Sequence, residues 1–211
     1  MKRTDILNFL DELFPNAHCE LVYNNHFELL IAIILSAQTT DLKVNKISPL
    51  LFEKYTTPSE LANAKPEDVV EILKPLGLAN VKAKNIISTA KSLVDNFGGI
   101  VPKTMDELLT LSGVGNKTAN VFLAEGYNER RFAVDTHVSR VSRRLEISKS
   151  ENPLKIEEDL KVFFKDDDWT RLHHKFIFFG RYFCMAKKPL CNNCKLKKYC
   201  SKWQYFFCLY R

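Results

Sequence analysis

The sequence has no long apolar segment. Its longest uninterrupted apolar run, residues 29–35, is far shorter than the roughly 20 residues that a membrane-spanning helix needs. The N-terminal stretch MKRTDILNFLDELF contains acidic and amide residues where a signal peptide has an apolar centre and a small-residue cleavage site. These absences predict a cytoplasmic protein that contacts no membrane.

Strand-like alternation and linkers rich in glycine or serine are also nearly absent. Apolar residues instead recur at helical spacing, for example in the sets Ile6, Phe9, Leu10, Leu13 and Val44, Ile47, Leu50, Leu51. Pro58 and Pro66 are typical of helix starts, and Gly98 is typical of a helix end. The pattern therefore predicts an all-α fold, while the residues alone leave the number of domains open.

The charge balance is positive, with 31 Lys and Arg against 25 Asp and Glu, a net charge of +6. A basic surface favours a polyanionic partner, although charge alone does not exclude an inert basic surface. The hydrophobic share of 45% is ordinary for a folded globular protein and argues against disorder.

Four of the six cysteines, Cys184, Cys191, Cys194 and Cys200, form the pattern C-x6-C-x2-C-x5-C. In a reducing compartment such a group indicates a metal site before it indicates disulfides. Four thiolates bind either a tetrahedral zinc or an iron–sulfur cluster, and their number does not separate the two. Cys19 and Cys208 lie outside the pattern and are expected to be ordinary thiols.

The segment LSGVGNKTANV contains Gly113, Val114 and Gly115, followed by Lys117. Two glycines around one apolar residue allow backbone angles that other residues resist, so we expect a tight turn with outward N–H groups. The helix expected over residues 117–125 would point its N-terminus at the same place, which favours an anion such as phosphate. The alternative is an ordinary linker between two packed helices, and the glycines alone do not decide.

Asp135 stands alone among apolar neighbours in the segment AVDTHV. The simple interpretation is a helix N-cap. The functional one is a carboxylate that stabilises developing positive charge or carries a proton, and the two roles are compatible. His137 is expected to be a hydrogen-bonded structural histidine.

LSGVGNKTANV resembles the helix-hairpin-helix of the endonuclease III family of DNA glycosylases, and AVDTHV resembles the segment with that family's catalytic aspartate. The cysteine spacing is similar to the family's [4Fe–4S] loop at every ligand. The resemblance implies two helical domains, one over residues 22–131 and one formed by residues 1–21 with 132–211. It also implies a [4Fe–4S] cluster bound by the four cysteines.

The implied activity is that of a DNA glycosylase and abasic-site lyase for oxidised pyrimidines in duplex DNA. Lys117 would attack the sugar and form a Schiff base, and Asp135 would assist it. Within segments LSAQTTD and LGLANVKAKN, Gln38 would fill the space that the extruded base leaves and Leu78 would wedge the opposite strand. Without the resemblance, Gln38 is a polar residue at a helix end and Leu78 is a core leucine.

The implied partner is double-stranded DNA with damaged bases or abasic sites, bound by a monomer associated with the nucleoid. Cations around the cysteines would form a phosphate-binding patch; they are Arg181, Lys187, Lys188, Lys195, Lys197 and Lys198. The alternative is a solvated charged loop.

Two other functions stay open. A related adenine- or thymine-mismatch glycosylase would share the hairpin and the cluster, but such relatives generally lack a lysine at position 117. A DNA-binding or redox-sensing iron–sulfur protein without catalysis would need only the hairpin and the cluster, and Lys117 with Asp135 argues against it. The aromatic tail SKWQYFFCLYR departs from the family pattern, and the sequence does not say whether it packs or stays exposed.

Overall fold

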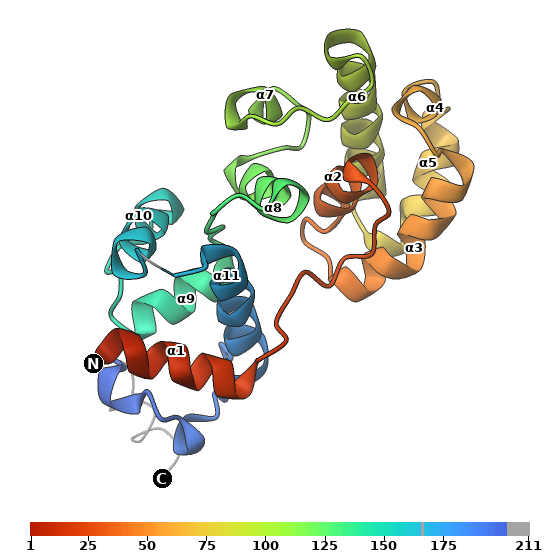
Figure 1. Ribbon diagram of the computed structural model, residues 1–211. Helices are drawn as coiled ribbons and strands as arrows, with labels where there is room; N and C mark the ends of the chain where they lie inside the picture. Colours follow the sequence, from red (N-terminus) through yellow and green to blue (C-terminus); the bar gives the residue numbers. More distant parts are fainter. Residues whose placement is uncertain (166, 202–211) are drawn as a thin grey trace. The chain divides into compact units, whose positions relative to one another are not determined.

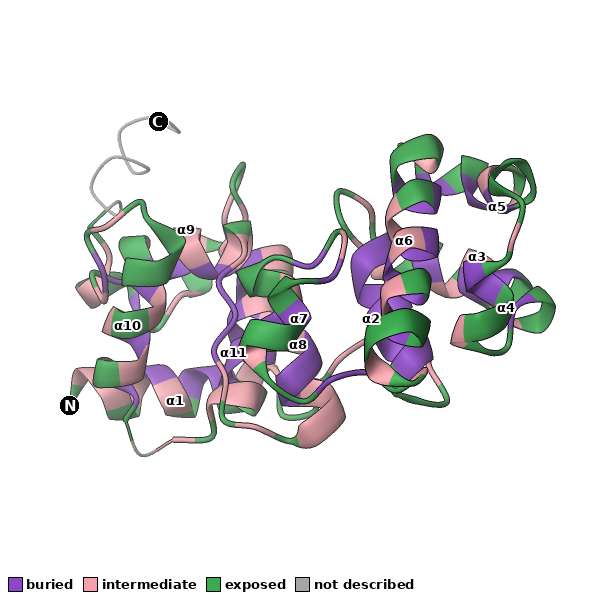
Figure 2. Ribbon diagram, turned by 90° about the horizontal axis from the view of Figure 1, so that it is seen from above, coloured by how far each residue is buried: buried purple, intermediate pink, exposed green. Residues whose placement is uncertain are grey.

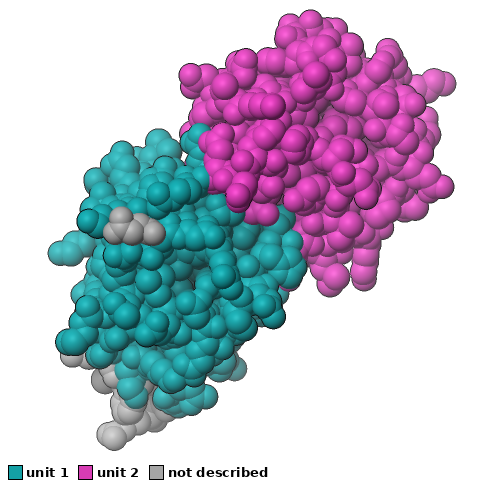
Figure 3. Space-filling view, viewed as in Figure 1, with its two compact units in different colours: residues 1–19, 130–211 teal, residues 20–129 magenta. Residues whose placement is uncertain are grey.

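The computed structural model describes residues 1–165 and 167–201, and the secondary structure in this part of the chain consists of helices and turns with no β-strand (Figure 1). The all-α prediction is therefore confirmed. The chain forms two compact units, one of residues 20–129 and one of residues 1–19 with 130–211 (Figure 3). Within the described residues, no helix is both long and apolar enough to cross a bilayer.

The unit of residues 20–129 is built around α2 (His26–Leu35), in which every residue after the first is buried (Figure 2). The longest helix, α6 (Ala79–Phe97), packs against α2 and against the short helices that precede it. The remaining elements of this unit are α3 (Asp41–Lys54), α4 (Pro58–Ala62), α5 (Pro66–Leu73), the 3₁₀ turn η1 (Lys74–Leu76), α7 (Met105–Leu109) and α8 (Asn116–Tyr127).

Local chemistry sets the helix boundaries in this unit. Thr40 and Thr57 cap α3 and α4 with their side chains, and Thr57 forms a capping box with Glu60. Gly98 ends α6 in the left-handed conformation, as its position predicts. The helical spacing did not always predict burial correctly: Leu50, for example, was expected on the core face of α3 and is exposed.

The second unit contains α1 (Lys2–Leu13), α9 (Thr136–Arg144), α10 (Pro153–Phe163) and α11 (Trp169–Phe178). After α11 come a π-helical turn η2 (Phe179–Phe183) and two 3₁₀ turns, η3 (Cys191–Asn193) and η4 (Lys197–Tyr199). Phe9 of α1 contacts the rings of Phe179 and Phe183 edge-on, with centroids 6.1 and 5.6 Å away. Aromatic packing thus joins the N-terminal helix to the segment that leads into the cysteines.

Candidate functional site

The turn between α7 and α8 contains the two glycines of the predicted phosphate-binding loop. Gly113 has φ +76°, a conformation that favours glycine, and a Cβ added there would crowd Nδ2 of Asn85 at 3.0 Å. Gly115 has φ −105° and ψ 179°, which any residue adopts. The expectation that both glycines supply unusual backbone angles was therefore wrong for Gly115.

Gly115 instead serves as the N-cap of α8. Among the described residues, no side chain caps this helix, so its first N–H groups receive no side-chain acceptor. Lys117 lies in this first turn and is exposed. The hairpin, which consists of α7, the glycine turn and α8, thus combines an uncapped helix N-terminus with a cation. This arrangement suits a negatively charged ligand.

The hairpin is held in place by α6, which the sequence did not reveal. Oγ1 of Thr89 donates a hydrogen bond to the carbonyl of Ser112 at 2.7 Å, and Oγ of Ser112 donates to Oδ1 of Asn85 at 3.3 Å. Thr89 is fully buried. The available signal was the presence of polar residues on the otherwise apolar face of this amphipathic helix, because buried polar groups need partners.

Gln38 and Leu78 share an uncommon backbone conformation. Both are exposed non-glycine residues with left-handed φ angles, 57° at Gln38 and 52° at Leu78. Leu78 is 55% exposed, so its interpretation as a core leucine was wrong. A left-handed non-glycine residue costs about 1–2 kcal/mol, and such strain persists where the surroundings impose it, often at functional positions.

Asp135 is the N-cap of α9, and its Oδ1 accepts a hydrogen bond from the N–H of Val138 at 2.8 Å. The cap interpretation is therefore correct, and the cap uses one of the two carboxylate oxygens. Asp135 belongs to the second unit and Lys117 to the first.

His137 accompanies Asp135 in α9 and packs closely. Its Nδ1 lies 3.2 Å from Nη2 of Arg140, and its Cβ lies 2.8 Å from where a Cβ on Gly180 would be. Gly180 thus has no room for a side chain. These contacts fit the expected structural histidine.

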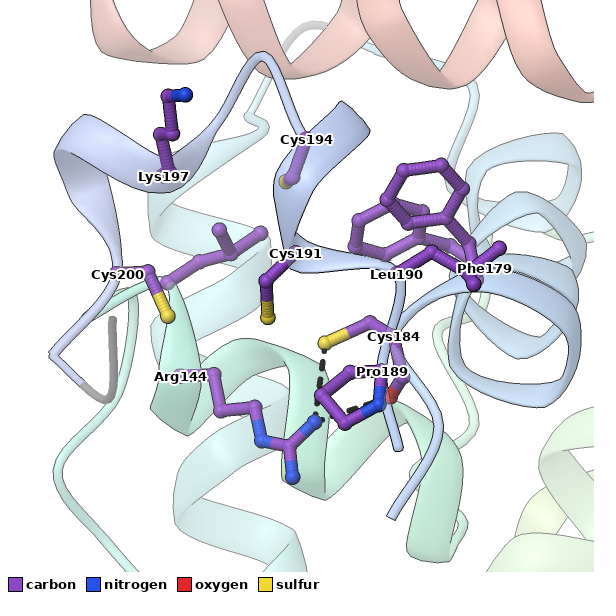
Figure 4. A pocket seen from close by; sticks show the side chains of 11 residues that line it. Arg144, Phe179, Cys184, Pro189, Leu190, Cys191, Cys194, Lys197 and Cys200 are labelled. Atoms are coloured by element: carbon purple, nitrogen blue, oxygen red, sulfur yellow. Dashed lines mark hydrogen bonds between the residues drawn. The ribbon is translucent and has the colours of Figure 1, made fainter. Parts of the chain in front are cut away.

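The four patterned cysteines line a single pocket, with Phe179 and Leu190 in its wall (Figure 4). All four are free thiols. No group of three or more His, Cys, Asp or Glu in the described part of the chain is arranged to bind a single metal ion. The cysteines therefore surround a space and do not converge on one point.

Burial makes this cavity unfavourable for bare thiolates. It raises the pKa of Cys194 to about 11, and burial followed by repulsion from the neighbouring thiolates also raises the pKa of Cys191. Nη1 of Arg144 lies 3.2 Å from Sγ of Cys184 and donates to the carbonyl of Met185 at 2.8 Å. Nε of Arg140 donates to the Cys184 carbonyl at 3.2 Å. Two arginines of α9 therefore hold the first cysteine in place.

Two of the six cations in the predicted phosphate-binding patch form ion pairs with acidic residues of α1. Lys195 pairs with Glu12 at 2.6 Å, and Lys198 pairs with Asp5 at 2.7 Å. Both pairs link the cysteine loop, residues 184–200, to α1. Lys187 and Lys188 lie between Cys184 and Cys191 in the sequence, and both are exposed. Lys188 has φ 51°. Cys208 and the aromatic tail after residue 201 lie outside the described residues.

Comparisons with known proteins show which family this chain is similar to. The profile of the HhH-GPD superfamily base excision DNA repair proteins matches residues 31–166. Endonuclease III of Bacillus subtilis (strain 168) is 43% identical over 94% of this chain and 91% of its own length. Endonuclease III of Escherichia coli (strain K12) is 40% identical over 95% of each chain.

Solved structures of endonuclease III are also similar to this chain over nearly its whole length. A non-covalent endonuclease III–DNA complex has a TM-score of 0.93 and 41% identity, and covers 98% of each chain. A trapped covalent endonuclease III–DNA intermediate has a TM-score of 0.92 and 42% identity, and covers 97% of this chain and 98% of its own. A thermostable thymine-DNA glycosylase, with a TM-score of 0.85, 22% identity and 97% of each chain covered, shares the fold. The chain therefore belongs to the endonuclease III family, the base excision repair enzymes that combine DNA glycosylase and abasic-site lyase activity.

Proposed function

We propose that this enzyme excises oxidised pyrimidines from duplex DNA with Lys117 as its nucleophile. In this proposal Asp135 stabilises positive charge and accepts a proton. The observation that carries the proposal is the position of Lys117, an exposed lysine in the first turn of a helix with an open N-terminus. The covalent DNA complex of a 42% identical relative supports a nucleophile on the protein.

The proposed reaction begins when the neutral amine of Lys117 attacks C1′ of the damaged nucleotide. A bond forms from Nζ to C1′ while the glycosidic bond breaks, and the base leaves with the electron pair and takes up a proton. Nζ then loses a proton and the C1′–O4′ bond breaks. The ring oxygen O4′ keeps the electron pair and takes up a proton, and C1′ and Nζ form a protonated Schiff base. Loss of a proton from C2′ then expels the 3′ phosphate, so one amine serves both base release and strand cleavage.

Asp135 supplies negative charge for this sequence. As an ionised carboxylate it stabilises the positive charge that develops on the sugar and accepts a proton from Nζ. The hydrogen bond from Val138 to Oδ1 fixes the carboxylate at the start of α9 and leaves Oδ2 for this role.

Base excision requires the damaged nucleotide to leave the base stack. We assign Gln38 to the vacated space and Leu78 to the opposite strand, because both are exposed residues held in a conformation that most side chains avoid. Exposed side chains in imposed backbone conformations are suited to entering a duplex.

The phosphate backbone is the proposed ligand of two surfaces. One is the hairpin turn of Gly113, Val114 and Gly115, and the other is the exposed pair Lys187 and Lys188. Contacts of this kind position the protein without reading sequence. The partner is duplex DNA with damaged bases or abasic sites, which the enzyme binds as a monomer associated with the nucleoid.

The four cysteines are the proposed ligands of a [4Fe–4S] cluster. Their cavity fits a polynuclear group, because the sulfurs surround a space with an apolar wall. A bound cluster would replace the thiol protons with iron and make the loop rigid.

Borohydride reduction tests the nucleophile. The unmodified protein with a duplex that contains one oxidised pyrimidine should give a stable adduct, whereas Lys117→Gln should give neither adduct nor base release and should bind within a few fold. Lys91→Gln, the same change at an exposed lysine of α6, is the control and should behave like the unmodified protein. Trapping that persists in Lys117→Gln would place the nucleophile elsewhere. Base release without any adduct would indicate a mismatch-type enzyme.

A further inference from the structure

We propose that one face of α6 is a positioning element that holds the Leu78 turn and the hairpin at a fixed separation, with Lys82 as the residue that positions Leu78. The inference rests on the proposed role of Leu78 in the duplex. Residues 78, 82, 85 and 89 follow the helical repeat and therefore share one side of the helix. The helix begins directly after Leu78.

At the N-terminal end of α6, Lys82 anchors the preceding turn. Its side chain is buried, at 4% exposure, and Nζ donates a hydrogen bond to the carbonyl of Leu76 at 3.2 Å. Leu76 is the last residue of η1, so the ammonium group lies at the negative end of the preceding helical segment. Burial lowers the pKa of Lys82, as expected for an ammonium group that gives up water for few partners.

The anchored carbonyl lies just before the strained residues. Gly77 has φ 71° and Leu78 has φ 52°, while the Leu78 carbonyl accepts the N–H of Lys82 at 3.0 Å. Lys82 therefore contacts the turn from both sides, through its backbone to Leu78 and through its side chain to Leu76. Between these two bonds the turn has little freedom, and Leu78 stays outside the core at 55% exposure.

Farther along α6, two further polar residues hold the hairpin. Thr89 donates to the carbonyl of Ser112, and Asn85 accepts from the Ser112 hydroxyl and lies against Gly113. One rigid helix thus begins directly after the proposed wedge, Leu78, and farther along its length it holds the hairpin turn that makes the proposed phosphate contact. Because small misplacements at a reacting centre cost up to about a hundredfold in rate, a fixed separation between these two contacts has catalytic value.

Lys82→Met tests the assignment, since methionine keeps the unbranched apolar stem of lysine and removes the donor. We expect base release from a damaged duplex to slow by about tenfold or more. The fluorescence rise of 2-aminopurine opposite the lesion, which reports unstacking, should fall in parallel. Borohydride trapping on a single-stranded abasic oligonucleotide, which needs no wedge, should be unchanged. Lys82→Arg, which restores a cationic donor, should recover most of the duplex activity.

The matched control is Lys84→Met, the same substitution at an exposed position of the same helix, which should leave all three measurements unchanged. Thr89→Val should instead weaken affinity for undamaged duplex and spare the 2-aminopurine signal. In a Leu78→Ala background, Lys82→Met should add little, because both changes then remove the same function.

Three outcomes would overturn the proposal. Equal loss on the duplex and on the single strand would mean that Lys82 has only a structural role. Full additivity of Lys82→Met with Leu78→Ala would mean that Lys82 does not act through Leu78. Normal duplex activity of Lys82→Met would remove the positioning role outright. Normal activity of Leu78→Ala would be a different failure, because it removes the proposed wedge itself.

Discussion

Asp135 shows how one residue can have a structural and a chemical role. Its Oδ1 caps α9 through the N–H of Val138, so the carboxylate stabilises the helix whether or not it takes part in catalysis. The residues that follow in α9 hold the Cys184 segment, since Arg140 and Arg144 donate to its carbonyl and sulfur. A substitution at Asp135 therefore tests chemistry only if the cap is preserved.

Asparagine separates the two roles of Asp135. Asn is as good an N-cap as Asp, whereas alanine costs about 1 kcal/mol of stability. We expect Asp135→Asn to unfold at the same temperature as the unmodified protein and to release base about a hundredfold more slowly, because it lacks the negative charge. Asp135→Ala should be slow and less stable. Single-turnover rates beside thermal unfolding curves measure both effects, and an active Asp135→Asn would exclude the charge role.

At the scale of the element, the cysteine loop uses its lysines in two ways. Lys195 and Lys198 form ion pairs with α1, while Lys187 and Lys188 are exposed to solvent. The division follows from where α1 lies, because its acidic residues contact the later part of the loop. The proposed phosphate contact is therefore assigned to the earlier part.

Charge reversal at Lys187 and Lys188 should weaken binding to damaged and undamaged duplex alike. Neutralising a phosphate releases counterions, so the dependence of log K on log salt should become shallower by about 0.9 for each phosphate that the variant no longer neutralises. Lys65→Glu with Lys91→Glu makes the same charge change at exposed sites of the other unit and controls for net charge. Fluorescence anisotropy over a salt series measures the slopes. Equal slopes for both double variants would show that net charge, and not this pair, sets the affinity.

At the scale of the whole molecule, the two ends of the described chain depend on each other. The aromatic side chain of Phe9 packs on Phe179 and Phe183, and the hydroxyl of Tyr199 donates to Asp5 at 2.7 Å. Cys184 and Cys194 pack against the same apolar core. The cysteine loop and α1 are thus parts of one core, while residues 20–129 have a core of their own.

Cys194→Ser should affect the two units differently. If the cysteines bind a [4Fe–4S] cluster, the purified unmodified protein should be brown with about four irons per chain, and the variant should lose iron and colour. Hydrogen exchange should then show faster exchange in α1 and the cysteine loop, with α6 still protected, because the units have separate cores. A colourless unmodified protein with one zinc would contradict the cluster assignment. Faster exchange in both units would contradict their independence.

Much of this protein could be predicted from its sequence. Helical spacing is a local property, so the all-α class follows from apolar periodicity, and several helix limits follow from Pro58, Pro66 and Gly98. The cysteine pattern and the hairpin segment are also local, and they were sufficient to indicate the family. The errors arose where local pattern is ambiguous: Leu50 and Leu78 are apolar residues that sequence alone assigns to a core, and Gly115 is a glycine whose backbone is ordinary.

Tertiary structure alone decided the contacts between distant segments. The sequence by itself determined the local features: Gly113 allows the tight turn, and Asp135 can cap the helix that follows it. It did not determine that Asn85 lies against Gly113, that Lys82 is buried under the Leu76 carbonyl, or that Lys195 and Lys198 bind α1. Most of these partners are far apart along the chain, and their residue types are common ones that do not by themselves indicate a contact. They meet only because packing the apolar faces of the helices brings particular polar atoms together, and buried polar atoms must then find partners.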